Sequence, residues 1–534
     1  MGILSWLVIV PFLTTVAVIA TPNPKQIRWV ALFGTGIQLI LTAVVAMKFW
    51  ALAGAETGEH SMATHLYMVE QFDWFKSLGI QYFLGIDGIS MSMVMLTSVI
   101  IFTGVLASWN VENRTREFFA LLLVLVTGVF GVFLSFDLFL FFTFYEVAVL
   151  PMYLLIGIWG TGPKEYSAMK LTLMLMAGSA FILVGFLALY HTAGQSTGVY
   201  SFDLTKMAAF QYPTEMQAWV FPMIFLGFGV LGAIYPFHTW SPDGHASAPT
   251  AVSMLHAGVL MKLGGYGALR IAVYLLPEGA KEWALFFMGL TTINILYGAF
   301  GAIRQKDLKY FTAYSSVSHC GVVLFGIATL NMMGLKGAVL QMFSHGIMTG
   351  LFFALIGMVY GRTHTRIIPD MGGLAKVMPW LAVCFYIAGL ASLGLPGFSG
   401  FVAESHVFMG GFFGNAWHSS TATRTLTILA AMSIVVTAVY VLRGLGTVFL
   451  GPIPAYHEGS HHDAQGTHGT HGTHGAHGAH GAHGVNLAKL TDATFTEKLT
   501  TGILIACLAL VGVFPQFMIN LIESSIYPIL NRLH

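Results

Sequence analysis

The chain has 534 residues, of which 56% are hydrophobic and only 9% are charged. Soluble domains are usually about 25% charged, so this composition excludes an ordinary soluble protein and indicates one that crosses a membrane many times. The net charge of +1 gives no reason to expect nucleic acid or acidic substrates as partners. The three cysteines form no C-x-x-C pair, so we expect no disulfide framework and no metal or iron–sulfur site.

Apolar stretches of about 20 residues are long enough to span a bilayer as helices. By this criterion we expect an all-α polytopic membrane protein with about fourteen transmembrane helices. The first lacks a basic leader and a cleavage site, so we expect a retained helix and not a signal peptide. The expected ranges are 3–20, 28–51, 83–108, 116–134, 136–159, 166–192, 217–235, 248–276, 283–303, 308–330, 335–360, 378–412, 422–448 and 499–527.

Two of these helices are interrupted by glycine or proline. The seventh ends in Tyr235-Pro236, and the twelfth contains Gly394-Leu395-Pro396-Gly397. Helices four to eight and nine to thirteen each form a set of five whose fourth member is interrupted. Paired interruptions are typical of inverted-repeat transporters, which place their ion site at the breaks. We therefore expect two five-helix repeats, with helices seven and twelve broken.

Five segments follow from this pattern. They are helices one to three (1–115), the first repeat (116–276), the second repeat (277–450), a loop rich in His and Gly (451–497) and a C-terminal transmembrane helix (498–534). From Gly466 the loop reads GTHGTHGTHGAHGAHGAHG, with a histidine in every three-residue unit. This pattern has no apolar face, so we expect a flexible segment; uptake of metal ions by the histidines is the alternative.

Lysine and arginine in the short loops predict the orientation, because they favour the cytoplasmic side. If the N-terminus lies outside, the inner loops carry about twice as many Lys and Arg residues as the outer loops. We therefore expect a multi-pass membrane protein with both termini outside and the His-rich loop in the cytoplasm.

Ionisable side chains in the apolar helices are the candidate functional groups. Lys262 follows Gly258–Met261 and precedes another apolar run, at a depth where a lysine costs about 2.5–3.5 kcal/mol on insertion scales and marks an ion or proton path. Glu146 lies near the middle of the fifth helix, where burial favours its protonated form. A neutral, hydrogen-bonded carboxylic acid is the structural alternative, and we favour a proton site.

Three further groups lie near helix ends or breaks. Lys170 could extend to the inner surface or pair with Glu146, and the sequence leaves both open. Glu404 follows the second break, where unwound backbone lines a polar cavity. Asp243 precedes the eighth helix and is interpreted as a loop anchor or helix-dipole partner.

Five histidines complete the candidates. His238 and His245 flank the first break, and His319 and His345 lie in the tenth and eleventh helices. A neutral imidazole accepts on one nitrogen and donates from the other, so these residues favour a proton relay. Metal binding is the alternative, but no pair has the i, i+4 spacing of a helical metal site. His256, six residues before Lys262, is rotated about 240° from it and faces elsewhere.

The motifs of helices five to twelve resemble those of one family. They read FYEVAVLPMYLLIGIWG, PFHTWSPDGHASAPTAVSMLHAGVLMKLGGYG, DLKYFTAYSSVSHCG, GAVLQMFSHG and MGGLAKVMPWLAVCFYIAGLASLGLPGFSGFVAE. They are similar to the antiporter-like subunits of respiratory complex I, and most of all to the M-type subunit (chain 4) of NADH–quinone oxidoreductase. The resemblance implies fourteen helices with two inverted repeats and proton translocation driven by quinone reduction elsewhere. It implies a non-redox subunit with no cofactor of its own.

The resemblance also implies partners and roles. NADH, FMN, iron–sulfur clusters and quinone would bind to partner subunits, and the L-type and N-type antiporter-like subunits would lie beside this chain in the lipid bilayer. Glu146 matches the glutamate of the family's fifth helix, Lys262 the lysine of the eighth, and Glu404 the terminal carrier of the twelfth. The family's polar-axis histidines match His319 and His345, and those around the seventh-helix break match His238 and His245.

One family residue is missing. A lysine normally lies in helix seven, five residues before the proline, and pairs with the fifth-helix glutamate; here the position is Leu231. Lys170, His238 or His256 would replace this cation, or the subunit pumps by a modified route or not at all. A cation/proton antiporter or membrane-bound hydrogenase subunit and a pump-deficient scaffold remain alternatives. The predicted proton-transfer residues are Glu146, Lys170, His238, His245, His256, Lys262, His319, His345 and Glu404.

Overall fold

A computed structural model describes residues 2–53, 66–414, 420–452 and 490–533. The His-rich tract and the prediction made for it lie outside the described residues. The helices and strands have these bounds: α1 Ile3–Ala20, α2 Pro24–Ala53, β1 Tyr67–Phe75, η2 Lys76–Leu78, β2 Ile80–Ile86, α3 Gly88–Ala107, α4 Thr115–Leu134, α5 Leu138–Trp159, α6 Lys164–Thr197, α7 Leu204–Ala209, α8 Thr214–Leu231, α9 Trp240–Ser247, α10 Thr250–Leu255, η3 His256–Leu260, α11 Met261–Gly267, η4 Ala268–Val273, α12 Pro277–Arg304, α13 Leu308–Ala328, α14 Met332–Thr363, η5 Ile368–Asp370, η6 Leu374–Lys376, α15 Pro379–Ser392, α16 Ser399–Phe413, α17 Ser420–Ala431, α18 Ser433–Leu445, η7 Gly446–Leu450, α19 Phe495–Val513 and α20 Gln516–Leu533.

The prediction of an all-α polytopic membrane protein is confirmed. In the described part of the chain, 12 helices are long and apolar enough to cross a membrane. Two other expected spans are built from shorter pieces. The eighth is helical from 250 to 273 through α10, η3, α11 and η4, and the twelfth consists of α15 and α16.

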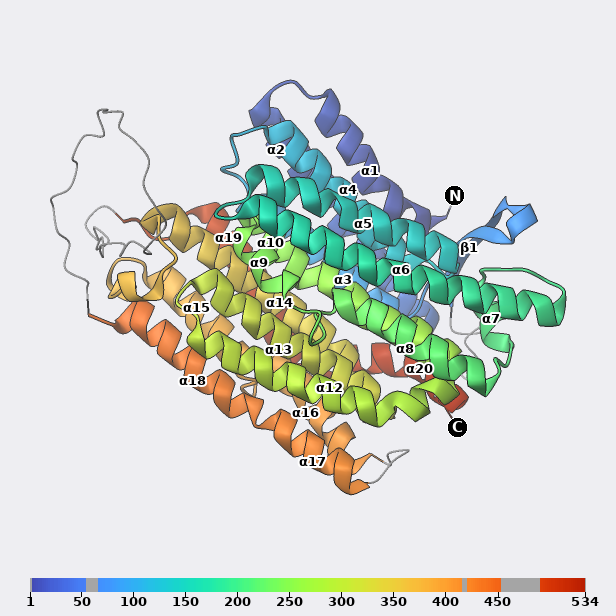
Figure 1. Ribbon diagram of the computed structural model, residues 1–534. Helices are drawn as coiled ribbons and strands as arrows, with labels where there is room; N and C mark the ends of the chain where they lie inside the picture. Colours follow the sequence, from blue (N-terminus) through green and yellow to red (C-terminus); the bar gives the residue numbers. More distant parts are fainter. Residues whose placement is uncertain (1, 54–65, 415–419, 453–489, 534) are drawn as a thin grey trace, which may run out of the picture.

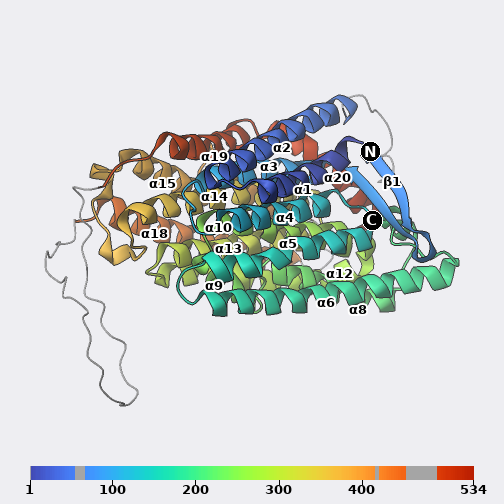
Figure 2. The same cartoon turned by 90° about the horizontal axis from the view of Figure 1, so that it is seen from above.

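The long helices run side by side, and both termini lie at the same end of the bundle (Figures 1 and 2). The strand β1 and the short helix α7 lie at this end too, which we call the terminal face. At the other end, the opposite face, the chain turns from α5 into α6 and from α12 into α13. Termini on one face agree with an even number of crossings; which face is cytoplasmic stays a prediction.

The expected start of the third helix was wrong. Ile80–Ile86 forms β2, which pairs antiparallel with β1, and α3 begins only after Asp87. The Asp87 carboxylate accepts a hydrogen bond from the Ser90 amide at 2.9 Å and caps the helix. A short apolar run such as IQYFLGI cannot be assigned to strand or helix from its periodicity, and this caused the error.

The last predicted helix is also divided. In place of one helix over 499–527, α19 ends at Val513 and α20 begins at Gln516. Pro515 has no amide hydrogen and disfavours helical backbone in the residue before it. Phe514 accordingly has φ −121° and ψ 62°.

Both predicted breaks occur. After α8 the chain turns through Ala233, whose φ is 54°, before α9 begins. Between α15 and α16, Gly394 and Gly397 have φ of 64° and 99°, a conformation that glycine adopts without steric cost. A Cβ at Gly394 would lie 2.9 Å from Oε2 of Glu404, so the absence of a side chain lets this carboxylate lie against the break.

Candidate proton-transfer site

Lys262 lies at the centre of the bundle with 2% of its surface exposed. It follows the π-helical segment η3, and its Nζ donates a hydrogen bond to the carbonyl of Ala257 at 2.5 Å. The same Nζ is 2.8 Å from Nδ1 of His345 on α14. One of these two partners is a group that can itself accept and pass on a proton.

A chain of polar contacts leads from His345 to the second break. The rings of His345 and His319 have centroids 5.2 Å apart, and Nδ1 of His319 is 3.1 Å from Oε1 of Glu404 on α16. The amide nitrogen of Gln341 lies 3.3 Å from both His319 Nδ1 and Glu404 Oε1. The side chains of Lys262, His345, His319 and Glu404 are all buried, so α11, α13, α14 and α16 together hold one internal row of polar groups. We call Lys262, His345, His319 and Glu404 the polar row.

Glu146 is not joined to this row. It lies half-buried on α5, and the side chain of Ser179 on α6 is within hydrogen-bonding reach of its carboxyl group. No lysine, arginine or histidine contacts it within the described residues, and none of the three proposed replacement cations does so. The neighbouring α8 carries Leu231, which is fully buried.

Lys170 pairs with a different carboxylate, so pairing with Glu146 was wrong. Its Nζ lies 2.7 Å from Oδ2 of Asp243, and the hydroxyl of Tyr310 donates to Oδ1 of the same residue at 3.1 Å. Asp243 belongs to the short helix α9 and not to a loop. The Lys170 and Asp243 side chains are each 22% exposed, so this cluster is open to the surroundings and does not form part of the buried row.

His245 and His256 face one another. Their ring centroids are 4.3 Å apart, and the Trp240 ring packs on His256 at 5.1 Å. Nδ1 of His245 and both nitrogens of His256 are buried, and no described residue hydrogen-bonds them. The rotation from Lys262 predicts only that His256 points to another face of the helix; the structure shows that it faces α9 and not Glu146.

His238 lies at the break itself, apart from both groups. Its ring packs on those of Tyr235 and Tyr297, with centroids 5.7 and 4.8 Å away. Of the nine predicted residues, four therefore form the polar row and two form the histidine pair; Glu146, Lys170 and His238 stand elsewhere.

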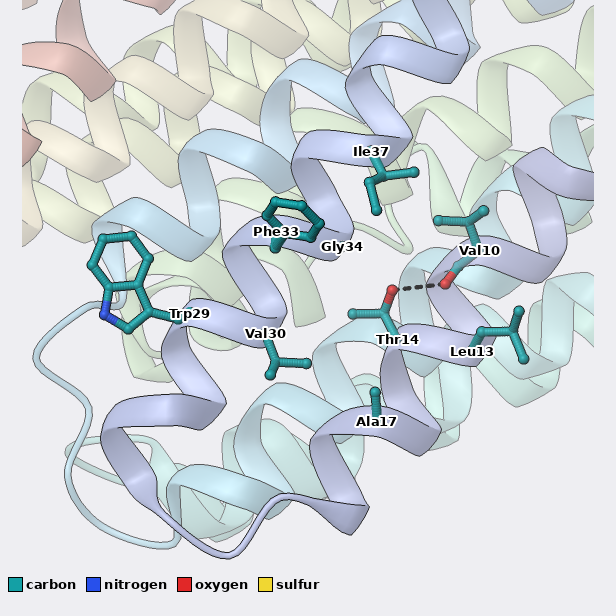
Figure 3. A pocket seen from close by; sticks show the side chains of 9 residues that line it. All are labelled: Val10, Leu13, Thr14, Ala17, Trp29, Val30, Phe33, Gly34 and Ile37. Carbon is teal, nitrogen blue, oxygen red and sulfur yellow. Dashed lines mark hydrogen bonds between the residues drawn. The ribbon is translucent and has the colours of Figure 1, made fainter.

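Of two cavities in the structure, only the smaller one adjoins the site. A cavity of about 10 Å³ lies beside Lys262 and is lined also by Gly232 and Cys320, which is about the space of one water molecule. A much larger hollow of about 550 Å³ opens between α1 and α2 (Figure 3). It carries no ionisable side chain, with Thr14 bonded to the carbonyl of Val10, so it has no part in proton transfer.

Sequence reasoning missed one buried cation and assigned no metal ligands. Lys309 is the second residue of α13, and a lysine so near a helix end is expected to extend to water. It is 5% exposed. Within the described residues no three His, Cys, Asp or Glu side chains come together as a metal site requires.

Known proteins share this sequence pattern. The model of the family described as "NADH:quinone oxidoreductase/Mrp antiporter, TM" matches residues 135–438. The chain is 40% identical over 449 residues to NAD(P)H-quinone oxidoreductase chain 4 3 of Picosynechococcus sp., which covers 84% of this chain and 79% of that protein. It is 41% identical over 455 residues to chain 4 of Acaryochloris marina, with 84% and 82% covered.

Solved structures share the fold. A chain of respiratory complex I from Thermus thermophilus with bound NADH has a TM-score of 0.80 and 25% identity, covering 99% of this chain and 100% of that chain. A chain of the Mrp complex from Dietzia sp. has a TM-score of 0.78 with 99% and 100% covered, but at 20% identity it shows the fold alone.

Proposed function

Because this chain belongs to the family of NADH:quinone oxidoreductase and Mrp antiporter membrane subunits, as an M-type (chain 4) member, we propose that it translocates protons in the membrane arm of an NADH–quinone oxidoreductase. The family predicted from the motifs is confirmed. The energy would come from quinone reduction on partner subunits, which would also hold NADH, FMN and the iron–sulfur clusters. The chain would act as a non-redox subunit of this translocase.

The polar row is the observation that carries this proposal. The Lys262 ammonium would give a proton to Nδ1 of His345 at 2.8 Å, and the imidazole would release one from its other nitrogen. The ring centroids of His345 and His319 are 5.2 Å apart, and Nε2 of His345 has no hydrogen-bond partner among the described residues, so a water molecule would carry the proton from this nitrogen to His319. His319 would then pass the proton to Glu404 at 3.1 Å, beside the break through which it would leave.

The family also suggests which subunits and which membrane surround this chain. We propose that L-type and N-type antiporter-like subunits lie beside this chain in the plasma membrane, with both termini outside. A role as a subunit of a cation/proton antiporter has less support. The chain of the solved Mrp complex is 20% identical to this chain, whereas the chain 4 relatives are 38–41% identical to it. We propose that the first repeat is modified: with Leu231 in place of a lysine and no cation beside Glu146 in the described residues, it lacks the lysine–glutamate pair whose opening and closing would gate proton transfer.

The test is Lys262→Met in the assembled complex, reconstituted in proteoliposomes. Methionine keeps the length of the side chain and removes the proton carrier, so we expect fewer protons translocated per electron pair while the subunit still assembles. Lys164→Met is the control, because Lys164 Nζ also donates to a backbone carbonyl, that of Ile158 at 2.9 Å, but lies at the opposite face. An unchanged proton ratio with Lys262→Met would refute the role of this lysine.

A further inference from the structure

Lys309 is a second buried lysine, between the polar row and the opposite face. It lies in the first turn of α13 with 5% of its surface exposed. Its Nζ donates to the carbonyl of Ala248 at 2.5 Å, just past the end of α9. An ammonium group has three donors, and within the described part of the chain this carbonyl is its one acceptor.

The groups around Lys309 do little to stabilise its positive charge. Nη1 of Arg366 donates to the carbonyl of Ala246 at 2.7 Å, which brings a second cation to the same helix end. The nearest carboxylate, Asp307, is engaged by Nη2 of Arg366 at 3.2 Å and by the backbone amides of α13. Asp243, also on α9, is paired with Lys170. A buried ammonium facing another cation releases its proton more readily than one in water.

The next titratable groups inward are the histidine pair. His245 lies on α9 three residues before Ala248, and His256 follows on the next helix. With a rise of about 1.5 Å per residue, His256 lies about 9 Å and Lys262 about 18 Å inward from Thr250. Lys309, His245 with His256, and Lys262 therefore stand at successive depths.

The histidine pair has nitrogens available for a proton. Nδ1 of His245 and both nitrogens of His256 are buried without a partner among the described residues. Buried polar atoms are almost always hydrogen-bonded, so bound water or a transient partner must serve these three. Water at this place would connect the pair to Lys309 on one side and to Lys262 on the other.

We propose that Lys309 is the proton-loading group of this subunit, through which protons from the opposite face reach the histidine pair and then Lys262. The ammonium gives its proton through water to Nδ1 of His245 and becomes a neutral amine. Water at the Asp307–Arg366 pair, whose side chains are 15% and 18% exposed, then returns a proton to the amine. This inference rests on the proposed function.

A capping role is the competing explanation, because a cation at a helix C-terminus stabilises the helix without moving protons. Lys309→Arg separates the two roles: arginine keeps the charge and the donors to Ala248 but does not deprotonate in proteins. Lys309→Met removes both. Lys164→Arg and Lys164→Met are the matched controls, since that lysine also caps a helix end at the same face.

The measurement is the proton translocation rate and the proton-to-electron ratio of the whole complex in proteoliposomes, with assembly followed on native gels. We expect Lys309→Arg to assemble normally and to slow proton transfer through this subunit by about 10²-fold or more, as Lys309→Met does. Both Lys164 variants should match the unmodified complex.

Three outcomes would overturn the inference. Normal pumping by Lys309→Arg would assign a capping role to this lysine, even if Lys309→Met fails to assemble. Normal pumping by both Lys309 variants, with a loss in Lys262→Met, would remove Lys309 from the path and leave the proposed function standing. Normal pumping by Lys262→Met as well would refute the proposed function itself.

Discussion

At the scale of single residues, Lys262 can be buried because two hydrogen-bond acceptors contact its ammonium group. Lys262 Nζ has the Ala257 carbonyl and His345 Nδ1 within 2.8 Å, which replace the water lost on burial. His345 can take up the proton that the lysine holds, whereas a carbonyl cannot. In the proposed function, these two groups share one proton and act as a unit.

Sharing of one proton predicts non-additive losses. His345→Leu should slow proton translocation about as much as Lys262→Met, and the double variant should be no slower than either one, because residues that act as a unit lose their function together. Translocation rates of the three complexes in proteoliposomes measure this. Cys320→Ala is the control, since its sulfur lies 4.0 Å from His345 Nδ1 but offers only a weak hydrogen bond. Additive losses would show that the two residues act separately.

The sequence predicted that Lys262 and Glu404 are buried, but it predicted neither the burial of Lys309 nor all of the partners of these side chains. Lys262 and Glu404 could be recognised because an ionisable group in an apolar helix is costly in any fold. The partner of Lys170 could not, because Asp243 is 73 positions away and reaches it only through the turn that places α9. The burial of Lys309 depends on the same turn. That these groups carry protons stays a prediction.

At the scale of elements, small residues allow the helix with Lys262 to approach the interrupted helix α8. A Cβ at Gly264 would lie 2.6 Å from the carbonyl oxygen of Phe228 and 2.6 Å from the amide nitrogen of Gly232. Both contacts are with backbone, so α8 and α11 approach each other closely at the end of α8. The positions of the spans could be predicted from hydropathy; this contact and the π-helical segments could not, because they arise from packing between helices.

Gly264→Ala should therefore destabilise the subunit. The added methyl group requires a shift of α8, and overpacking of this kind costs about 1–3 kcal/mol. We expect a lower thermal unfolding midpoint and less assembled complex. Gly289→Ala is the matched control, because this glycine lies within α12 and a Cβ there meets nothing within 4 Å. It should be neutral or stabilise the helix by about 0.5–1 kcal/mol. Equal unfolding midpoints for the two variants would contradict the close contact.

At the scale of the whole molecule, the two repeats differ in their polar interiors. The polar row begins at Lys262 in the first repeat and continues through His345, His319 and Glu404 of the second repeat by direct or near contacts. In the first repeat Glu146 faces Ser179, and Gly178 beside it packs against Gly227 and Val230 of α8. Leu231 follows Val230 in the sequence and is fully buried, so the position where the family has a lysine holds an aliphatic side chain.

Leu231→Lys tests whether a lysine restored at this position of the first repeat changes proton translocation by the subunit. Leu231 is fully buried, so a lysine there needs an ionised partner, and the resemblance to the family names Glu146 as that partner. We expect the variant to assemble and to change the rate of proton translocation. Adding Glu146→Gln should abolish assembly, because removing one partner of a buried pair costs about 3–5 kcal/mol. Leu231→Met is the uncharged control and should cost less than about 1.5 kcal/mol. If Leu231→Lys and Leu231→Met assemble and translocate protons alike, a gate at this position is not what limits the subunit. The first repeat would then supply Lys262 and the first break, while His345, His319 and Glu404 of the second repeat carry the protons onward.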